Sequence, residues 1–258
     1  MDMTPLPKVS VRTLVYDTLD LVLDNTAKQA GLAIVRGPVG IGKTFALRQL
    51  ADEYRARGVK VYMLTCRTEI AGRINGAANE VLSQENIWEH RDVRAAEVLW
   101  ELLRSRVFDP WDPKPSLLIT DEAQGWKPNV LNFFRDLWDL GDPARNGRSD
   151  ALAFGIVMVG NSSFINRNGV EEEAKFGPLL SRRTISVDLE RPSKGELREY
   201  AAKLAGPDAA RALAAYGERT GSMRGIEKAY RLARSLSDAA ELTAQDIEFA
   251  IRYLGGLA

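Results

Sequence analysis

The chain has 258 residues, with 35 Lys and Arg against 35 Asp and Glu, so its formal net charge is zero at pH 7. This balance excludes a chain-wide basic signature for nucleic acid, although it leaves a local basic face open. A single cysteine excludes an intrachain disulfide, and a single histidine argues further against a Cys/His metal centre. No apolar run approaches the about 20 residues of a membrane span, and the N-terminus lacks the regions of a signal peptide. We therefore expect a cytoplasmic protein without membrane contact, built as one large domain or as a core with a small satellite.

The N-terminal part of the chain predicts a helix followed by a strand and a glycine-rich turn. Apolar residues recur at helical spacing over positions 10–29, and a short apolar stretch follows at 32–35. The next eight residues, 37–44, read G-x-x-x-x-G-K-T, and a helical pattern begins at Phe45. Strand, glycine turn and helix N-terminus together predict a phosphate-binding loop, or P-loop.

The P-loop predicts a specific role for each of its last residues. Lys43 is expected to reach the β- and γ-phosphates of a nucleoside triphosphate, and the Thr44 hydroxyl to ligate Mg²⁺. The residues expected to bind the nucleotide here are Gly37, Pro38, Val39, Gly40, Ile41, Gly42, Lys43, Thr44 and Phe45.

The middle of the chain alternates between helical and strand patterns. We expect the P-loop helix to end near Arg57 before Gly58, a helix from about Thr68, and a proline-punctuated loop at 108–115. Further helices are expected at 93–106 and 128–140, a loop at 141–150, and strands at 59–64, 116–120, 153–159 and 185–189. The alternation predicts an α/β fold with a parallel sheet covered by helices on both faces.

Beyond Arg191-Pro192 the chain is entirely helical in pattern. Ser193 with Glu196, and more weakly Thr243 with Asp246, fit capping boxes. Helices are expected at 193–204, 207–216, 222–236 and 243–254. We therefore predict a P-loop core at residues 1–190 and a small C-terminal helical lid domain at 191–258.

A second motif lies at the end of the strand at 116–120. Its apolar residues lead into Asp121 and Glu122, which a parallel sheet would deliver to its carboxyl edge, where ligands bind. Asp121 is expected to hold Mg²⁺ directly or through water, and Glu122 to act as the general base on the attacking water. A solvated strand end is the plainer interpretation, and the P-loop upstream disfavours it.

Three weaker features fit an ATPase site. Asn161 follows the strand at 153–159 and could contact the γ-phosphate or the attacking water, or serve simply as a turn residue. Arg182 or Arg183 could reach the γ-phosphate held by a neighbouring subunit, or could be a surface pair. Arg224 opens a lid helix and could contact the nucleotide. The order of all three along the chain favours the functional interpretation.

In this order the motifs resemble the Walker A, Walker B, sensor 1, arginine-finger and sensor 2 elements of AAA+ ATPases. Within these, the sequence Asp121-Glu122-Ala123-Gln124 and the compact lid resemble the transposition-regulator ATPases, the group of MuB, TnsC and TniB. The resemblance implies a homo-oligomeric ring or helical filament that uses ATP and Mg²⁺. It also implies sequence-nonspecific binding to duplex DNA and a transposase partner. Only one helical segment precedes the first strand, so DNA binding is expected to come from the AAA+ body.

The corresponding region of those relatives predicts DNA contacts at Arg67, Thr68 and Arg73, which could meet phosphates without reading sequence. An ordinary solvated helix start fits each of these residues equally well. Further candidate contacts are Trp126, Lys127, Arg145 and Arg148, and Trp111 could be an interface anchor or a packing residue.

Other activities stay open at this point. An ExeA-like ATPase that acts on a protein partner carries the same DEAQ sequence, and a helicase-loader-like ATPase is a close cousin. A scaffold that binds ATP and barely hydrolyses it is also compatible, although Glu122 argues against it.

Overall fold

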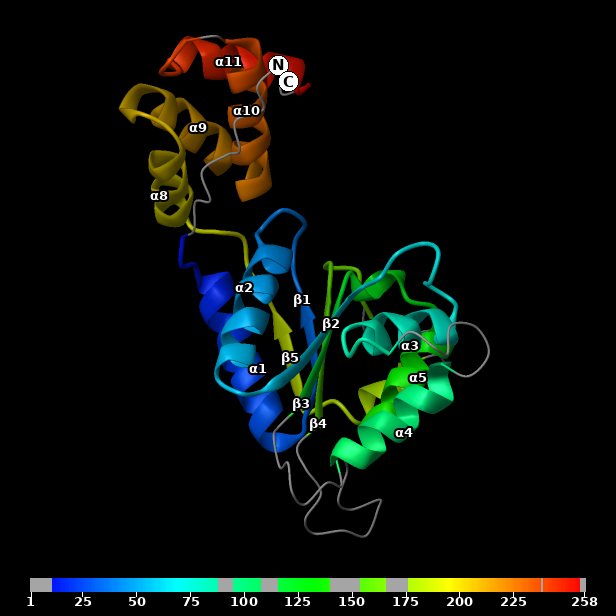
Figure 1. Ribbon diagram of the computed structural model, residues 1–258. Helices are drawn as coiled ribbons and strands as arrows, with labels where there is room; N and C mark the ends of the chain where they lie inside the picture. The colour runs from blue at the N-terminus through cyan, green and yellow to red at the C-terminus, as the bar shows by residue number, and fades with distance from the viewer. Residues whose placement is uncertain are drawn as a thin grey trace. The chain divides into compact units, whose positions relative to one another are not determined.

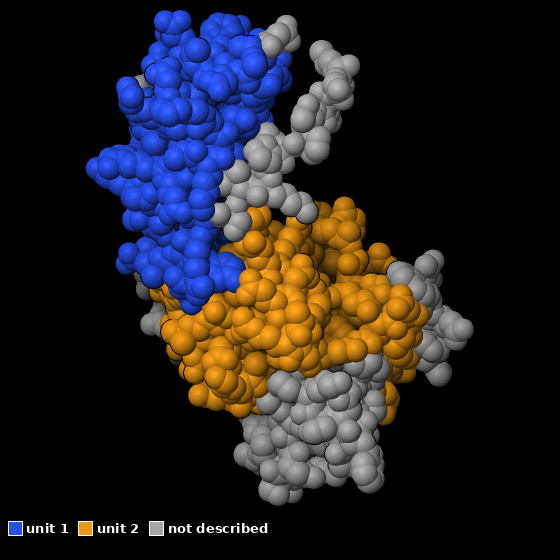
Figure 2. Space-filling view, turned by 60° about the vertical axis from the view of Figure 1, so that its left-hand side comes forward, with its two compact units in different colours: residues 1–17, 38–43, 190–258 blue, residues 18–37, 44–189 orange. Residues whose placement is uncertain are grey.

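The computed structural model describes residues 11–87, 95–107, 116–139, 154–165, 176–237 and 239–255. The chain divides into two compact units, which Figure 2 distinguishes by colour. One consists of residues 18–37 and 44–189, and the other of residues 1–17, 38–43 and 190–258. The loops expected at 108–115 and 141–150 lie outside the described residues, and so do Trp111, Arg145 and Arg148.

A five-stranded sheet forms the centre of the first unit, and every pair of neighbouring strands in it is parallel. The strand order is β2-β3-β4-β1-β5, so the expected parallel sheet is confirmed. β3 and β4 are buried along their whole length, as strands covered on both faces must be. The strands are β1 (Leu32–Arg36), β2 (Lys60–Thr65), β3 (Ser116–Asp121), β4 (Phe154–Gly160) and β5 (Ile185–Asp188).

Helices cover both faces of this sheet (Figure 1). On one side lie α1 (Leu14–Gln29) and α2 (Lys43–Ala56), and on the other α3 (Ile74–Ser83), α4 (Ala95–Val107) and α5 (Pro128–Asp139). Successive side chains of a strand point to opposite faces, so each strand contributes to both layers. The layer with α3 to α5 buries Leu32, Ile34, Tyr62, Leu64, Leu118, Phe154, Ile156 and Met158 from the strands.

The helix expected from about Thr68 begins later than the sequence predicted. Residues 68–72 form turns, and α3 starts only at Ile74. Ile70 is buried, so its spacing to Ile74 resembled a helix. The turn is instead stabilised by a side chain of α5, because the carbonyl oxygen of Gly72 accepts a hydrogen bond from Asn129 Nδ2 at 2.9 Å.

In the described part of the chain, every helix or strand after β5 is a helix, as expected. These helices are α8 (Lys194–Leu204), α9 (Pro207–Thr220), α10 (Met223–Leu236) and α11 (Ala244–Tyr253). Both predicted capping boxes are present, one from Ser193 and Glu196 and the other from Thr243 and Asp246. None of the helices in the described part of the chain is long and apolar enough to cross a membrane.

α9 continues four residues beyond its predicted end at 216. Gly217 lies inside the helix, where a Cβ atom would come within 2.4 Å of Ile226 Cδ1 on α10. The glycine therefore permits close packing of the two helices, and the helix ends instead at Gly221, whose φ of +62° is the left-handed conformation of a helix C-cap.

Candidate nucleotide-binding and hydrolysis site

The P-loop follows β1 and ends where α2 begins at Lys43. Gly40 and Gly42 have φ angles of +85° and +98°, which residues with a side chain rarely adopt. A Cβ atom built on Gly42 would meet nothing within 4 Å, so the space beside it is open. The first turn of a helix leaves its N–H groups without partners inside the helix. Loop and helix start therefore offer a set of donors suited to a polyphosphate.

Lys43 lies folded over this loop. Its Nζ donates a hydrogen bond to the carbonyl oxygen of Pro38 at 2.7 Å, and the side chain is half-buried. The ammonium group is thus held at the loop itself. A phosphate group bound by the loop would compete with this carbonyl oxygen for the lysine, and the contact of Lys43 with phosphate stays a prediction.

The start of α10 contacts the same loop, within the unit formed by residues 1–17, 38–43 and 190–258. The carbonyl oxygen of Gly40 accepts hydrogen bonds from Arg224 N at 3.3 Å and from Ser222 Oγ at 3.5 Å. A Cβ atom at Gly40 would lie 2.4 Å from Ser222 Oγ, so this close approach also requires glycine. Arg224 begins its helix beside the P-loop with an exposed side chain, and its contact with nucleotide stays a prediction.

Thr44 and Asp121 meet directly. The Thr44 hydroxyl donates to Asp121 Oδ2 at 2.5 Å, and Asp121 Oδ1 accepts from Glu122 N at 2.9 Å. Asp121 is the last residue of β3 and only 1% exposed, so both bonds serve a buried carboxylate. The fold thus joins the last residue of the P-loop motif to the acidic strand end, which are 77 positions apart in sequence.

This pair of residues fits Mg²⁺ in its chemistry. A hydroxyl and a carboxylate are oxygen ligands, which Mg²⁺ prefers, and the ion usually completes its coordination with waters and substrate phosphates. In the described ranges no group of three or more His, Cys, Asp or Glu side chains is arranged to hold a metal. A site that depends on phosphate oxygens as further ligands therefore suits Thr44 and Asp121 better than a metal cage made of protein alone.

Glu122 follows Asp121 in an unusual backbone conformation. Its φ of +52° and ψ of +39° place it in the left-handed region, and its side chain is exposed. Glu122 Oε2 accepts a hydrogen bond from Gln124 Nε2 at 2.5 Å, and Gln124 Oε1 accepts one from Asn161 N at 2.9 Å. β3 and β4 are neighbours, so Asn161 lies where the sequence predicted, next to the acidic strand end. Sequence analysis assigns no role to Gln124, because nothing in the DEAQ sequence alone indicates its bond to Asn161.

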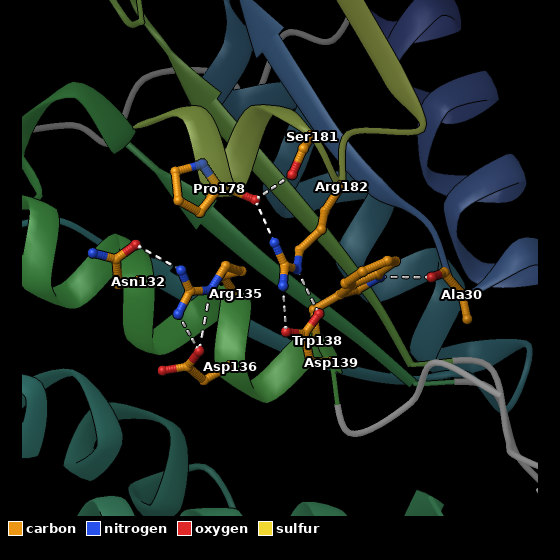
Figure 3. Close-up of polar contacts among 9 residues, drawn as sticks. All are labelled: Ala30, Asn132, Arg135, Asp136, Trp138, Asp139, Pro178, Ser181 and Arg182. Atoms are coloured by element: carbon orange, nitrogen blue, oxygen red, sulfur yellow. Dashed lines mark hydrogen bonds and ion pairs between the residues drawn. The ribbon is translucent and has the colours of Figure 1, made fainter. Parts of the chain in front are cut away.

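The two candidate finger arginines precede β5. Figure 3 shows the guanidinium group of Arg182 between Asp139 and Pro178. Arg182 Nε and one terminal nitrogen donate to the Asp139 carboxylate at 2.7 and 3.0 Å, and the other terminal nitrogen donates to Pro178 O at 2.7 Å. The Arg182 side chain is 15% exposed. Arg182 is therefore engaged within its own subunit. Arg183 is half-buried as well.

The predicted DNA segment packs against the acidic strand end. Cys66 N donates to Asp121 O at 3.0 Å, and Lys127 N donates to Ala71 O at 2.8 Å. Arg67 is exposed and forms an ion pair with Glu80. Thr68, Arg73 and Lys127 are exposed as well.

Trp126 is only 4% exposed. Its side chain is therefore a packing residue, and not the DNA contact that the sequence suggested. Its indole nitrogen donates to Thr120 Oγ1 at 2.5 Å.

Cys66 lies beside the same segment. Burial raises the pKa of its thiol to about 11, and the negative charge of Glu122 adds to this effect. A Cβ atom at Gly125 would come within 2.8 Å of Cys66 Sγ, which shows how closely β2 approaches the residues that follow Glu122.

Comparison with known proteins agrees with the fold. The chain matches the AAA domain family over residues 25–167, which is more than half of its length. No curated protein matches it at a significant level. Among solved structures, the Cdc6 protein of Pyrobaculum aerophilum matches with a TM-score of 0.67 and 19% identity, over 98% of this chain and 69% of that one.

Two structures from Aeropyrum pernix are similarly related. The ORC2 protein in its ADPNP-ADP complexes matches with a TM-score of 0.66 and 18% identity, over 98% of this chain and 70% of that one. The ORC1 protein in complex with DNA matches with a TM-score of 0.67 and 16% identity, over 96% and 68%. At such identities the likeness establishes the fold, and the family rests on the domain match: the chain belongs to the AAA domain family.

Proposed function

We propose that the protein is an ATP-dependent DNA-binding AAA+ ATPase that assembles on duplex DNA and regulates or recruits a transposase. The observation that supports hydrolysis most directly is the contact between Thr44 Oγ1 and Asp121 Oδ2, with Glu122 next in the chain. It brings the P-loop hydroxyl, the acidic strand end and a second carboxylate to one edge of the sheet. We place this activity in the cytoplasm.

The residues divide the chemistry among them. Lys43 and the P-loop N–H groups bind the β- and γ-phosphates, and Thr44 with Asp121 hold Mg²⁺. The ion, when bound, offsets negative charge on the phosphate oxygens. Glu122 orients the attacking water and accepts its proton, and Asn161 contacts the γ-phosphate or that water. Arg224 contacts the nucleotide from its own helix.

An arginine of a neighbouring subunit completes the proposed site. We assign this role to Arg182 or Arg183, which would offset the charge that develops on the transferred phosphoryl group. Assembly into a ring or filament is then a condition for fast turnover, and hydrolysis would loosen the assembly.

Binding of DNA is proposed for the segment that carries Arg67, Thr68 and Arg73. Exposed basic side chains suit phosphate contacts that do not read sequence. The bonds from Cys66 N to Asp121 O and from Lys127 N to Ala71 O support a connection between this segment and the hydrolysis site. The similar structure of the Aeropyrum pernix ORC1 protein is a complex with DNA, which supports DNA as a proposed partner here.

Two resemblances bear on the partner of the DNA-bound assembly. Resemblance in the Asp121-Glu122-Ala123-Gln124 sequence favours a transposase. The likeness to ORC and Cdc6 structures favours a second candidate, a replication-initiator or helicase-loader role. An ExeA-like ATPase with a protein substrate would use the same hydrolysis site without DNA.

The test is the ATP hydrolysis rate over a range of protein concentrations, with and without duplex DNA of unrelated sequences. We expect a rate that rises cooperatively with concentration and is stimulated by every duplex. Lys43→Ala, which removes the phosphate contact, should abolish ATP binding, stimulation and DNA binding; Lys28→Ala, on the exposed face of α1, is the matched control. A concentration-dependent rate that ignores DNA would refute the DNA partner, and full DNA affinity in Lys43→Ala would refute the coupling to ATP.

A further inference from the structure

The side chain of Gln124 connects the ends of two neighbouring strands. Its Nε2 donates to Glu122 Oε2 at 2.5 Å, directly after β3, and its Oε1 accepts from Asn161 N at 2.9 Å, directly after β4. Gln124 is half-buried and belongs to the short 3₁₀ helix η1 (Ala123–Gly125). One amide group thus spans from the proposed general base to the strand end that carries the proposed γ-phosphate contact.

The orientation of this amide follows from its partners. A backbone N–H such as that of Asn161 is only a donor, so the atom of Gln124 that faces it must be the carbonyl oxygen. The NH₂ group then necessarily faces Glu122, whose ionised carboxylate is only an acceptor. Both partners require the same orientation, so Gln124 presents a fixed donor to Glu122.

As the proposed general base, Glu122 needs a partner that restricts its side chain to one position. Its side chain is exposed, and a free glutamate side chain samples several rotamers. A general base acts only when its oxygen lies within hydrogen-bond reach of the proton that it accepts. The bond from Gln124 occupies Oε2 and leaves Oε1 available to a water molecule. The carboxylate can therefore be held in place without losing its capacity as a base.

The other end of the connection is itself well anchored. Asn161 follows β4, which is buried along its whole length. Asn161 Oδ1 accepts hydrogen bonds from Ser163 N at 2.9 Å and from Ser163 Oγ at 2.6 Å, so its side chain has a defined position as well. A bond to Asn161 N therefore fixes Gln124 relative to the residue proposed to contact the γ-phosphate.

We propose that Gln124 is a positioning residue, which holds the carboxylate of Glu122 in register with Asn161 so that the base is aimed at water beside the γ-phosphate. This inference rests on the proposed ATP hydrolysis. In this role Gln124 acts through Glu122 and Asn161, to which it is hydrogen-bonded, and not on the nucleotide directly. Its removal should affect the chemical step and leave nucleotide binding unchanged.

The experiment compares Gln124→Ala and Gln124→Glu with the wild-type protein and with Gln49→Ala, a glutamine on α2. Gln124→Glu keeps the side-chain size and the acceptor for Asn161 N but removes the donor to Glu122. This variant still tests the proposal if Gln124→Ala does not fold. For both variants at position 124 we expect the Kd for ATP and KM within about twofold of wild type and kcat lowered by about 10- to 100-fold, part of what a general base contributes. Gln49→Ala should behave as wild type.

The split between Kd, KM and kcat separates positioning from a general structural defect. A defect that disturbs the P-loop or the ends of the two strands should raise the Kd for ATP and KM together with any fall in kcat. Loss of positioning alone should lower kcat and leave the Kd for ATP and KM near their wild-type values.

The outcomes distinguish this inference from the proposed function. An active wild-type protein together with an unchanged kcat in both variants at position 124 would overturn the role of Gln124 and leave ATP hydrolysis standing. A higher kcat in the variants would also overturn it, because Gln124 would then restrain the base. A wild-type protein that binds ATP and does not turn it over at any concentration, with or without DNA, would overturn the proposed hydrolysis itself.

Discussion

Arg182 and Asp139 form a bidentate ion pair, which connects the segment before β5 to the C-terminal end of α5. Their side chains are 15% and 21% exposed, and Arg182 also donates to Pro178 O. Paired hydrogen bonds between a guanidinium group and a carboxylate are strong, and in a largely buried setting removal of one partner leaves the other charge poorly solvated.

Arg182→Ala should therefore lower the free energy of unfolding by about 1–3 kcal/mol, since it removes hydrogen bonds to a charged group. Asp139→Asn should have an effect in the same range, and the double variant should lose less than the sum of the two. Urea unfolding of the wild-type protein, the two single variants and the double variant measures these free energies of unfolding. The exposed pair of Lys203 with Glu199 supplies the control, because its removal should cost under about 1 kcal/mol. Additive losses at positions 182 and 139 would contradict a coupled pair.

The finger role can be tested by mixing inactive subunits. Lys43→Ala cannot bind ATP but keeps its arginines, whereas Arg183→Ala keeps its own nucleotide site. If Arg183 acts on the neighbouring subunit, each variant alone should be inactive and an equimolar mixture should regain a part of the wild-type rate. The same mixing with Arg182→Ala assigns the finger between the two residues. No recovery in either mixture would argue against an arginine that acts between subunits.

Glu122→Gln should bind ATP normally and lose turnover by about 100-fold or more, because the amide cannot accept the proton of the attacking water. We expect its ATP-bound assemblies to persist on DNA. Dissociation of labelled duplex after dilution into ATP measures this, with Glu53→Gln on the exposed face of α2 as control. Rapid disassembly of the Glu122→Gln protein in ATP would contradict the link between hydrolysis and release.

The lowered pKa of Glu196 predicts that the stability of the fold depends on pH. Burial opposes its ionisation, but hydrogen bonds from Ser193 and from Leu14 N outweigh this effect and lower its pKa below the usual 4.5. A carboxyl group with a lowered pKa stabilises the fold above its unfolded pKa, and this contribution is lost as the pH falls through the folded value. Glu196→Gln should thus have a lower Tm than wild type at pH 7, and the difference should narrow below about pH 4.5. Glu199→Gln, on the same helix, is the control. A difference that stays constant from pH 7 to pH 3.5 would refute this linkage.

The raised pKa of Cys66 predicts that its thiol is alkylated slowly in the folded protein. With its pKa raised to about 11, the thiol should react with N-ethylmaleimide at pH 8 at least about 10-fold more slowly in the folded protein than in urea, because the thiolate is the reactive form. Glu122→Gln should speed the reaction, since it removes a negative charge near the sulfur. Cys66 is the single cysteine, so mass spectrometry reports on this site alone. Equal rates in the folded and unfolded protein would contradict the buried environment.

Sequence reasoning was strongest where local pattern and chemistry coincide. The P-loop sequence requires glycines at positions with positive φ, and Gly40 and Gly42 adopt such angles. Buried strands produce continuous apolar runs, so β3 and β4 were visible within one residue of their ends. The capping boxes of α8 and α11 likewise depend only on residues three positions apart.

Contacts between distant segments were not predictable in the same way. The bond from Asn129 to Gly72 and the pairing of Arg182 with Asp139 join residues 57 and 43 positions apart. The sequence predicts an end at 216 for the helix that runs to Thr220, because the packing of Gly217 against Ile226 on α10 is not visible in the sequence. Gln124 belongs to the same class, since its bond to Asn161 depends on the adjacency of β3 and β4.

The central place of β1 has a consequence for the synthesis of the chain. β1 lies between β4 and β5, and both neighbours follow it in sequence. A nascent chain on the ribosome therefore holds this strand, which is buried along its whole length in the folded protein, without a partner until residues 154–160 have emerged. Such delayed, non-local pairing folds slowly and exposes the strand to aggregation or to chaperones in the meantime. A fragment that stops before Phe154 would carry the whole P-loop sequence and still lack the sheet that shapes it.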